Sequence, residues 1–339
     1  MEKVNVAIVG ATGAVGEVMR EMLEQRGFPV KKLSLLASER SAGSRLQFVG
    51  KSIMVENLDT FDFSDTYIAL FSAGGSVSEK YAPIAASQGC IVIDNTSFFR
   101  RDPRIPLIVP EVNPHRIKDF KETNIIANPN CSTIQMLVAL KPLYDAVGIT
   151  RINVSTYQAV SGAGKRGIEE LASQTARLLN GQTYEPSVFT RQIGFNAIPH
   201  IGDFEDNGFT NEEMKMVWET QKIFEDEDIK VNPTCVRIPV FYGHSEAVSI
   251  ETRLPISVDE AKKLMSQAPG VSVIDERQNG GYPTAVSDAA GEDPVYVGRI
   301  RQNISVKNGL NLWIVADNVR KGAALNSVQI AEFLIKRHK

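Results

Sequence analysis

The opening of the chain, VNVAIV followed by GATGAVG and EVMREMLEQRG, constrains the fold more than any other segment. Residues 4–9 form a short apolar run that is typical of a strand buried on both faces. After the glycines, Val18, Met22 and Leu23 recur at the spacing of one helix face. A strand, a glycine turn and a helix in this order begin a βαβ unit, whose helix N-terminus can bind a pyrophosphate. The segment therefore predicts a dinucleotide-binding domain.

The glycines of this turn, Gly10, Gly13 and Gly16, form a GxxGxxG pattern that departs from the strict GxGxxG of many dinucleotide-binding folds. A turn that binds no ligand could use the same flexible residues. Because the glycines lie directly between a predicted strand and a predicted helix, nucleotide binding is the better interpretation.

Further apolar runs of strand length follow in the first half, and a helix-like segment at residues 78–89 separates two of them. The runs are residues 32–38, 67–73, 90–96 and 107–112. Strands that alternate with helices predict a mostly parallel, doubly wound sheet of the Rossmann type.

The segment ASERSAG follows the second predicted strand, where dinucleotide folds bind the adenosine ribose. Ser38, Arg40 and Ser41 offer donors to the 2′-phosphate of NADP, whereas an acidic residue at this place favours NAD. Glu39 is also present, so the choice depends on the direction of its side chain. We expect Glu39 to point away from the ribose and the cofactor to be NADP.

From residue 151 onward, the strand candidates become longer. In VSIETRL, Val248, Ile250 and Leu254 alternate with polar residues, which predicts a mixed, mostly antiparallel sheet. Helices are predicted at residues 165–180, 257–267 and 322–337. The sequence thus indicates an α/β protein with a Rossmann-type N-terminal domain and a second domain of α+β type.

Cys131 lies in IIANPNCSTIQM, between an apolar run and a helix-like segment. Pro129 prevents a helix upstream, and Ser132 or Thr133 can cap the helix that follows. The positive end of that helix would lower the pKa of the thiol and favour the nucleophilic thiolate. A buried structural cysteine remains an equal alternative here, and Cys90 and Cys235, at the starts of strand-like runs, fit the structural role better.

A nucleophilic thiol needs a base, and His244 is the best placed of the four histidines. It ends the strand-like segment CVRIPVFYGH, where a rigid strand could direct its ring. His115 and His200 lie in loops, and His338 lies in the terminal tail. Taken alone, His244 is more often a structural histidine than a catalytic one.

Composition argues against several classes of function. A formal net charge of -3 gives no basic field for nucleic acid or an anionic membrane, and no stretch of 18 apolar residues or signal-peptide cleavage region is present. Three cysteines are too few for a disulfide framework, and no Cys or His pair has zinc-ligand spacing. We expect a cytoplasmic protein with no metal and no nucleic-acid or membrane partner.

Six motifs follow one another in a single order: GATGAVG, DNTSFFR, NPNCST, STYQAVSGAG, NEEMK and CVRIPVFYGHSE. Together they resemble the aspartate-β-semialdehyde dehydrogenase family over essentially the whole chain, and the closing DNVRKGAALNS resembles the form typical of Gram-positive bacteria. The resemblance implies an NADP-binding domain of residues 1–129 plus 320–339 and a catalytic and dimerisation domain of residues 130–319. It also implies a homodimer, with a homotetramer as the alternative assembly.

The resemblance implies reversible conversion of aspartyl phosphate and NADPH into aspartate semialdehyde, NADP and phosphate. Cys131 matches the family's nucleophile, which forms a thioester, and His244 matches its acid/base residue. Arg237 matches the arginine that binds the substrate carboxylate, for which a bidentate fork is suited.

Four further residues match the family's substrate site, although periodicity alone would assign Glu212, Lys215 and Gln158 to the surface or core. Glu212 would meet the substrate ammonium, Lys215 and Arg100 would bind phosphate, and Gln158 would orient the substrate near the thiol. The residues that match the family's cofactor site are Gly10, Thr12, Gly13, Ala14, Val15, Ser38, Arg40, Ser41, Ser161, Gly162 and Asn318.

Three other interpretations remain open. A reductase of N-acetylglutamyl phosphate would share the fold, thiol and histidine, but it would have no site for a free ammonium. Glyceraldehyde-phosphate dehydrogenase is disfavoured because NCSTI replaces its usual SCTTN segment. A non-catalytic NADP-binding relative would be expected to lose the thiol or a substrate arginine.

Overall fold

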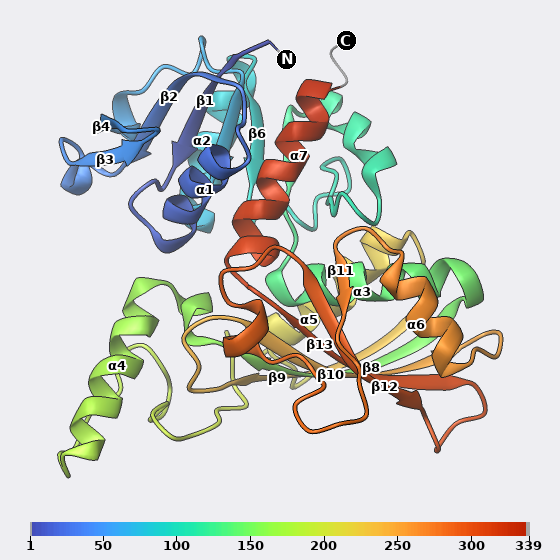
Figure 1. Cartoon of the computed structure of the whole chain (residues 1–339). Coiled ribbons are helices and arrows are strands. Elements are labelled where there is room, and N and C mark those ends of the chain that lie inside the picture. Colours follow the sequence, from blue (N-terminus) through green and yellow to red (C-terminus); the bar gives the residue numbers. More distant parts are fainter. Residues whose placement is uncertain (1, 337–339) are drawn as a thin grey trace. The chain divides into compact units, whose positions relative to one another are not determined.

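The computed structural model describes residues 2–336, and contacts between residues divide the chain into two units. The first unit includes the residues up to Asn130 together with those from Ala323 onward, and the second is Cys131–Gly322. Figure 1 shows the helices and strands of both. Within the described residues, no helix is both long enough and apolar enough to cross a membrane.

The first unit is built on a sheet with the strand order β3-β4-β2-β1-β5-β6-β7. All neighbouring strands are parallel except β3 and β4, so the predicted Rossmann-type parallel sheet is confirmed. The strands are β1 (Val4–Val9), β2 (Val30–Ala37), β3 (Arg45–Phe48), β4 (Lys51–Asn57), β5 (Ile68–Phe71), β6 (Ile91–Asp94) and β7 (Ile125–Ala127). The helices are α1 (Ala14–Gln25), α2 (Gly75–Ser87) and α7 (Leu325–Lys336).

One apolar core holds the first unit together, and the last described helix is part of it. Ile8 of β1, Met19 of α1, and Val328 and Leu334 of α7 belong to the same buried cluster. Figure 1 shows α7, in red, beside the strands of the first unit although it is the last described helix. Burial of apolar side chains therefore brings the end of the chain back to its beginning. Residue 337, the end of the predicted terminal helix, lies outside the described residues.

The strand predicted at residues 107–112 is wrong. Only Leu107 forms an isolated bridge, to Ala127, although the segment is buried. Pro110 cannot donate to a strand ladder, and the side chain of Asn113 accepts from Val109 N at 2.9 Å and donates to the carbonyl of Leu107 at 2.9 Å. Ile108 N still donates to Ala127 of β7, but Val109 N and the carbonyl of Leu107 are satisfied by a side chain, so the strand pairing does not continue along the run.

The second unit is built on a mixed sheet with the order β11-β12-β13-β10-β8-β9. Its three central pairs are antiparallel and its two outer pairs parallel, as predicted for a mixed, mostly antiparallel sheet. The strands are β8 (Ile149–Gln158), β9 (Lys230–Arg237), β10 (His244–Thr252), β11 (Val271–Val273), β12 (Val295–Gln302) and β13 (Gly309–Ala316). The helices are α3 (Cys131–Val147), α4 (Lys165–Leu179), α5 (Asn211–Phe224) and α6 (Val258–Ser266).

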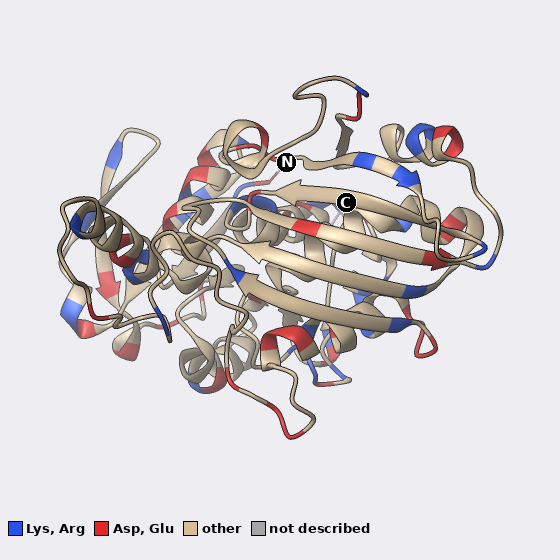
Figure 2. Ribbon diagram, turned by 90° about the horizontal axis from the view of Figure 1, so that it is seen from below, with Lys and Arg blue, Asp and Glu red and all other residues tan. Residues whose placement is uncertain are grey.

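The two faces of the second sheet differ. His244, Glu246, Val248 and Ile250 of β10 are buried on the face against which α3 packs. Ala247, which points the other way, is exposed. Figure 2 shows this second face, where the strands run without a helix in front and carry few charged residues along their middle parts.

Candidate functional site

A pocket of ≈ 500 Å³ lies in the first unit beside the ends of β1, β2 and β5. Most of the residues predicted to contact a cofactor there line it: Gly10, Thr12, Gly13, Ser38, Arg40 and Ser41. Ala14 and Val15 begin α1 directly after Gly13, and no side chain caps that helix. The first backbone N–H groups of a helix have no partner within the helix, so this uncapped start is suited to bind a pyrophosphate.

The turn at this pocket requires glycine at two positions. Gly10 has φ +88°, in the left-handed region that side chains disfavour. A Cβ atom on Gly16 would lie 2.2 Å from the carbonyl oxygen of Gly10. The glycines therefore allow α1 to pack closely against the end of β1, whatever the departure from the strict GxGxxG pattern.

The short 3-10 turn Glu39–Ser41 presents the polar end of the pocket. Arg40 and Ser41 line the pocket, whereas Glu39 is exposed and is not among its lining residues. The guanidinium of Arg40 and the hydroxyls of Ser38 and Ser41 are suited to the 2′-phosphate of NADP, and the carboxylate that does line the pocket, Asp59, accepts a hydrogen bond from Tyr81.

Sequence reasoning missed the opposite wall of the pocket, which Leu58, Asp59, Val77 and Tyr81 form. The Tyr81 hydroxyl donates to Asp59, and Lys80 Nζ donates to the Tyr81 oxygen at 2.7 Å. No short motif marks these residues, because they lie in a loop and on a helix that come together only when the sheet forms.

In the second unit, Cys131 is the first residue of α3 and is partly exposed. The helix dipole at this position stabilises a thiolate. The predicted capping by Ser132 or Thr133 is wrong, because α3 already begins at Cys131 and both residues are buried within its first turn. The other two thiols are buried, and burial raises the pKa of Cys90 to about 12.

His244, the first residue of β10, is completely buried, and Ala159 N–H donates to its Nδ1 at 3.0 Å. This contact fixes the ring and leaves the proton of the neutral ring on Nε2, which lies 3.5 Å from the amide nitrogen of Gln158. Burial, followed by the charge of Arg237, lowers the pKa of His244 to about 3. The ring is therefore neutral at physiological pH and can donate a hydrogen bond through Nε2.

Around this histidine, the structure brings together four of the residues predicted to bind substrate. Gln158 Nε2 donates to Glu212 Oε1 at 3.2 Å, and Lys215 Nζ donates to Glu212 Oε2 at 2.9 Å. Arg237, which is buried, donates from Nη1 to the carbonyl of Ala159 at 2.7 Å. The cluster thus contains one carboxylate, two cations and an amide, all from unit 2.

The residues predicted to contact the cofactor from the second unit lie next to His244 and Arg237 of the cluster. Ser161 and Asn318 exchange hydrogen bonds at 3.0–3.2 Å, and Asn318 Oδ1 accepts from Gly243 N at 2.9 Å. A Cβ on Gly162 would lie 2.8 Å from Arg237 Nη1 and 3.6 Å from His244 Nε2.

Gly322, which sequence reasoning missed, packs against the nucleophile candidate. A Cβ atom there would lie 2.7 Å from Cys131 Cβ. Its place in the tail, 191 residues after the cysteine, gives no local signal of this contact.

Arg100, the remaining predicted substrate residue, belongs to the first unit. It is buried in the loop after β6 and donates from Nη2 to the carbonyl of Asn95 at 2.8 Å. Asp94, at the end of β6, accepts from Ser78 and Thr96 and so orders the same loop.

No group of three or more His, Cys, Asp or Glu residues in the part of the chain that the structure describes is arranged to hold a metal ion. The polar residues of unit 2 instead form a site suited to a zwitterionic, anionic substrate beside a thiol.

Comparison with known proteins gives matches to both units. The sequence profile described as "Semialdehyde dehydrogenase, NAD binding domain" matches residues 5–120, and "Semialdehyde dehydrogenase, dimerisation domain" matches residues 140–321. Aspartate-semialdehyde dehydrogenase 2 of Vibrio cholerae is 62% identical over 335 residues, which cover 99% of this chain and 98% of that protein.

Solved structures of the same family are also similar to this chain. The crystal structure of aspartate semialdehyde dehydrogenase II from Vibrio cholerae complexed with ASA has a TM-score of 0.97 at 62% identity, with 99% of each chain covered. The enzyme from Candida albicans, solved with NADP, has a TM-score of 0.76 at 25% identity and 98% coverage of each chain.

The narrower resemblance to a form typical of Gram-positive bacteria is not supported. The Bacillus subtilis enzyme is 51% identical over 341 residues, which cover 98% of this chain and 97% of that protein. Its identity is lower than that of the Vibrio cholerae protein, which comes from a Gram-negative organism. The narrower assignment drawn from the closing DNVRKGAALNS motif is therefore not supported.

Proposed function

Since this chain belongs to the aspartate-semialdehyde dehydrogenase family, we propose that it catalyses the reversible NADPH-dependent reduction of L-aspartyl 4-phosphate to L-aspartate 4-semialdehyde, with release of phosphate. This reaction serves the biosynthesis of lysine, threonine, methionine and diaminopimelate. The observation that carries the proposal is the single cluster in unit 2 that joins His244, Arg237, Glu212 and Lys215, on the sheet face against which the Cys131 helix packs.

The pocket of the first unit fits the cofactor. Its ≈ 500 Å³ combine an uncapped helix start with Arg40 and Ser41 at one end. NADPH, when bound, supplies the hydride that reduces the acyl group. Ser161, Gly162 and Asn318 are proposed to border the nicotinamide from the second unit.

For the covalent step, we propose Cys131 as the nucleophile. The thiolate sulfur attacks the acyl carbon of the substrate, the bond between that carbon and the phosphate oxygen breaks, and phosphate leaves with the bonding electrons. The start of α3 stabilises the thiolate, and its backbone N–H groups can stabilise the oxyanion of the tetrahedral intermediate.

His244 is the proposed acid/base residue. Its Nε2–H can hydrogen bond to the sulfur anion when the product leaves. The low pKa keeps the ring neutral until negative substrate charge enters the site, because an opposite charge nearby raises the pKa of an imidazole.

Substrate recognition follows from the charges of the cluster. The buried guanidinium of Arg237 is suited to the substrate carboxylate, and Glu212 to its ammonium. Lys215 and Arg100 are proposed as phosphate ligands. Glu212 separates this proposal from an N-acetylglutamyl-phosphate reductase, whose substrate has no free ammonium.

A steady-state assay tests the function directly. Aspartate semialdehyde, phosphate and NADP should give NADPH, and the rate should fall when phosphate is left out or when NAD replaces NADP. Turnover of only the N-acetylglutamyl semialdehyde would overturn the proposal in favour of the related reductase. NADP binding without turnover of either aldehyde would indicate the non-catalytic relative.

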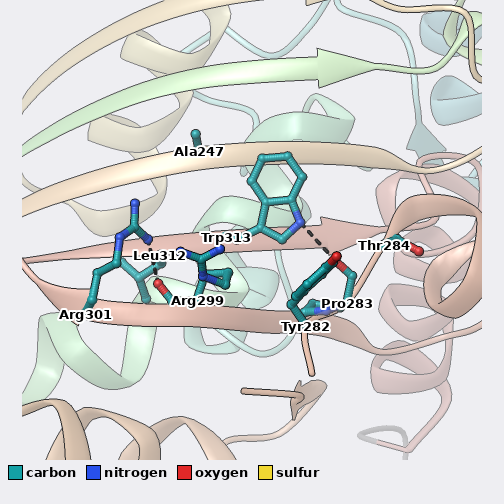
Figure 3. Close-up of a pocket in the computed structure, with 8 residues that line it drawn as sticks. All are labelled: Ala247, Tyr282, Pro283, Thr284, Arg299, Arg301, Leu312 and Trp313. Carbon is teal, nitrogen blue, oxygen red and sulfur yellow. Dashed lines mark hydrogen bonds between the residues drawn. The ribbon is translucent and has the colours of Figure 1, made fainter. Parts of the chain in front are cut away.

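The dimerisation domain of the family spans the second unit, so the chain is expected to form a homodimer. We propose that the uncovered face of its sheet is the surface involved. Figure 3 shows the hollow on this face, where Trp313 Nε1 donates to the carbonyl of Pro283 at 3.0 Å and Tyr282 and Leu312 lie beside it. A tetramer and a cytoplasmic location are further proposals, which light scattering and cell fractionation would test.

A further inference from the structure

A further buried carboxyl, which the mechanism above does not use, lies on the strand that begins with His244. Glu246 is completely buried on β10, two residues after His244, and its side chain points to the same face of the strand. That face packs against α3, the helix that begins with Cys131. In the sheet, Thr156 of β8 and Ile314 of β13 flank Glu246, and both are fully buried.

Glu246 differs from the other buried carboxyls of this unit. Glu213 accepts from the backbone N–H of Thr210 and of Cys235, at 2.7 and 3.0 Å. Glu170 accepts from a loop around Ser187. Within the described residues, neither oxygen of Glu246 has a hydrogen-bond partner. An ionised carboxylate without donors is costly in such a place, whereas a neutral acid needs one acceptor.

The charges around Glu246 also favour the neutral acid. Burial raises its pKa well above the usual value, and the amide of Gln135 opposes this only in part. The titratable group that faces it from β9 is Cys235, and the charges of Glu212 and Glu213 on α5 act on the same thiol. None of these groups is a cation that would stabilise the carboxylate.

Gln135 supplies the acceptor. It lies one helical turn after Cys131, is fully buried, and donates from Nε2 to the backbone carbonyl of His244 at 3.4 Å. Its Oε1 atom has no partner among the described residues. The side chain of Gln135 also acts on the carboxyl of Glu246, so an acceptor on α3 without a partner among the described residues lies near a carboxyl on β10 whose burial favours the protonated form.

We propose that Glu246 is a positioning residue that donates, as a neutral acid, to Gln135 Oε1 and thereby locks the first turn of α3, which carries Cys131, to the start of β10, which carries His244. The inference rests on the proposed roles of Cys131 and His244. No atom of Glu246 is required to touch substrate or cofactor.

The test compares Glu246→Gln, whose amide N–H can replace the acid proton, with Glu246→Met, which has similar length and no donor. The Gln variant should keep kcat within about twofold of the wild type, and the Met variant should lose at least about tenfold, because small misplacements of reacting groups are costly. Gln135→Met should cause the same loss, and the double Met variant no further loss.

A second readout does not depend on turnover. The alkylation rate of Cys131 by iodoacetamide, measured against pH, reports the thiolate, since Cys90 and Cys235 are buried. The profile should be unchanged in Glu246→Gln and should move to higher pH in Glu246→Met. Val248→Ala, which removes buried apolar volume two residues further along the same face, is the matched control: a lower Tm with an unchanged profile is expected.

Two outcomes would overturn the inference. If Glu246→Gln loses as much activity as Glu246→Met, the enzyme requires the ionised carboxylate of Glu246 and not a hydrogen-bond donor at this position. If Glu246→Met lowers only the Tm and leaves kcat and the alkylation profile as in the wild type, the residue is purely structural. A Cys131→Ser variant that still turns over would instead contradict the proposed function itself, so the two failures can be told apart.

Discussion

The dinucleotide pocket of the first unit and the cluster around His244 in the second unit are built in different ways. The pocket is made of a glycine turn, an uncapped helix start and exposed side chains such as Arg40. The cluster is made of buried polar groups, including His244, Gln158 and Arg237, which hydrogen bond to one another or to the backbone. The first type of site depends on local backbone shape, and the second depends on the whole second unit.

This difference has an energetic meaning. An exposed charge that loses its partner is hydrated by water, whereas a buried polar group that loses its partner keeps the full cost of desolvation. Changes in the pocket should therefore reduce affinity for one ligand. Changes in the cluster should disturb several residues together.

The largest effect is expected for Cys131→Ser. Loss of the nucleophile should reduce aldehyde oxidation by about 10⁴-fold or more, because groups that act as one catalytic unit fail together. The dissociation constant of NADP, measured by fluorescence titration, should change less than about twofold, since the cofactor pocket lies in the first unit. Weakened NADP binding in this variant would show that the two regions are not separable.

The second-largest loss of activity is expected for Gly162→Ala. The added Cβ would lie 2.8 Å from Arg237 Nη1, and this guanidinium is already held by Ala159. A shift of Arg237 should lower kcat/KM for aspartate semialdehyde by up to about 100-fold. Gly75→Ala is the control, because its Cβ would meet no atom within 4 Å. If Gly162→Ala has wild-type kinetics, Arg237 can move away from the added Cβ atom without loss of activity. The buried cluster would then tolerate a displaced side chain as the exposed pocket is expected to do.

Arg40→Ala tests the dinucleotide pocket, the other of the two regions compared. Loss of a charge-assisted contact of roughly 1.5–3 kcal/mol should raise KM for NADP by about 10- to 100-fold. KM for NAD, which has no 2′-phosphate, should be unchanged. Arg45→Ala removes a similar exposed arginine, bonded to Ser52 on β3 and β4, and should alter neither value. An equal loss for both cofactors would contradict the predicted 2′-phosphate site.

The smallest effects concern stability, where His244 of the cluster and the buried Glu246 on the same strand act with opposite signs. The pKa of His244 is lowered to about 3, so the unfolded chain takes up a proton below pH 6.5 that the folded chain does not. Stability from this group is therefore present above pH 6.5 and falls as the pH drops towards 3. The pKa of Glu246 is raised, so its contribution is present below pH 4.5 and falls as the pH rises.

The variant Glu246→Gln separates the contribution of Glu246 to stability from that of His244. It should raise the free energy of unfolding at pH 8, where the wild type must retain a buried proton, and have little effect at pH 4. The gain should not exceed about 1.4 kcal/mol for each pH unit above 4.5. Urea unfolding at both pH values measures it, and equal gains at pH 4 and pH 8 would contradict a neutral Glu246.

Local patterns predicted much of the fold because their physical cause is local. The strand, glycine turn and helix at residues 4–25 need only steric and hydrogen-bonding rules, and the helix predicted at residues 257–267 is found as α6, which Ser257 caps by accepting from Glu260 N. The same rules failed at residues 107–112, where the side chain of Asn113 satisfies backbone groups that a strand would otherwise pair. Periodicity also missed α5, which begins with a capping box at Thr210 and Glu213.

The sequence by itself determined the dinucleotide turn, the two types of sheet and, through the order of six motifs, the family and its candidate residues. Only the tertiary structure decided how Gln158, Glu212 and Arg237 surround His244, that Gly322 packs against Cys131, and that Glu246 is buried with no hydrogen-bond partner in the part of the chain that the structure describes. The physical reason is the separation along the chain of the residues that interact. Backbone sterics act between neighbours in the chain, whereas desolvation and buried hydrogen bonds depend on residues that only folding brings together.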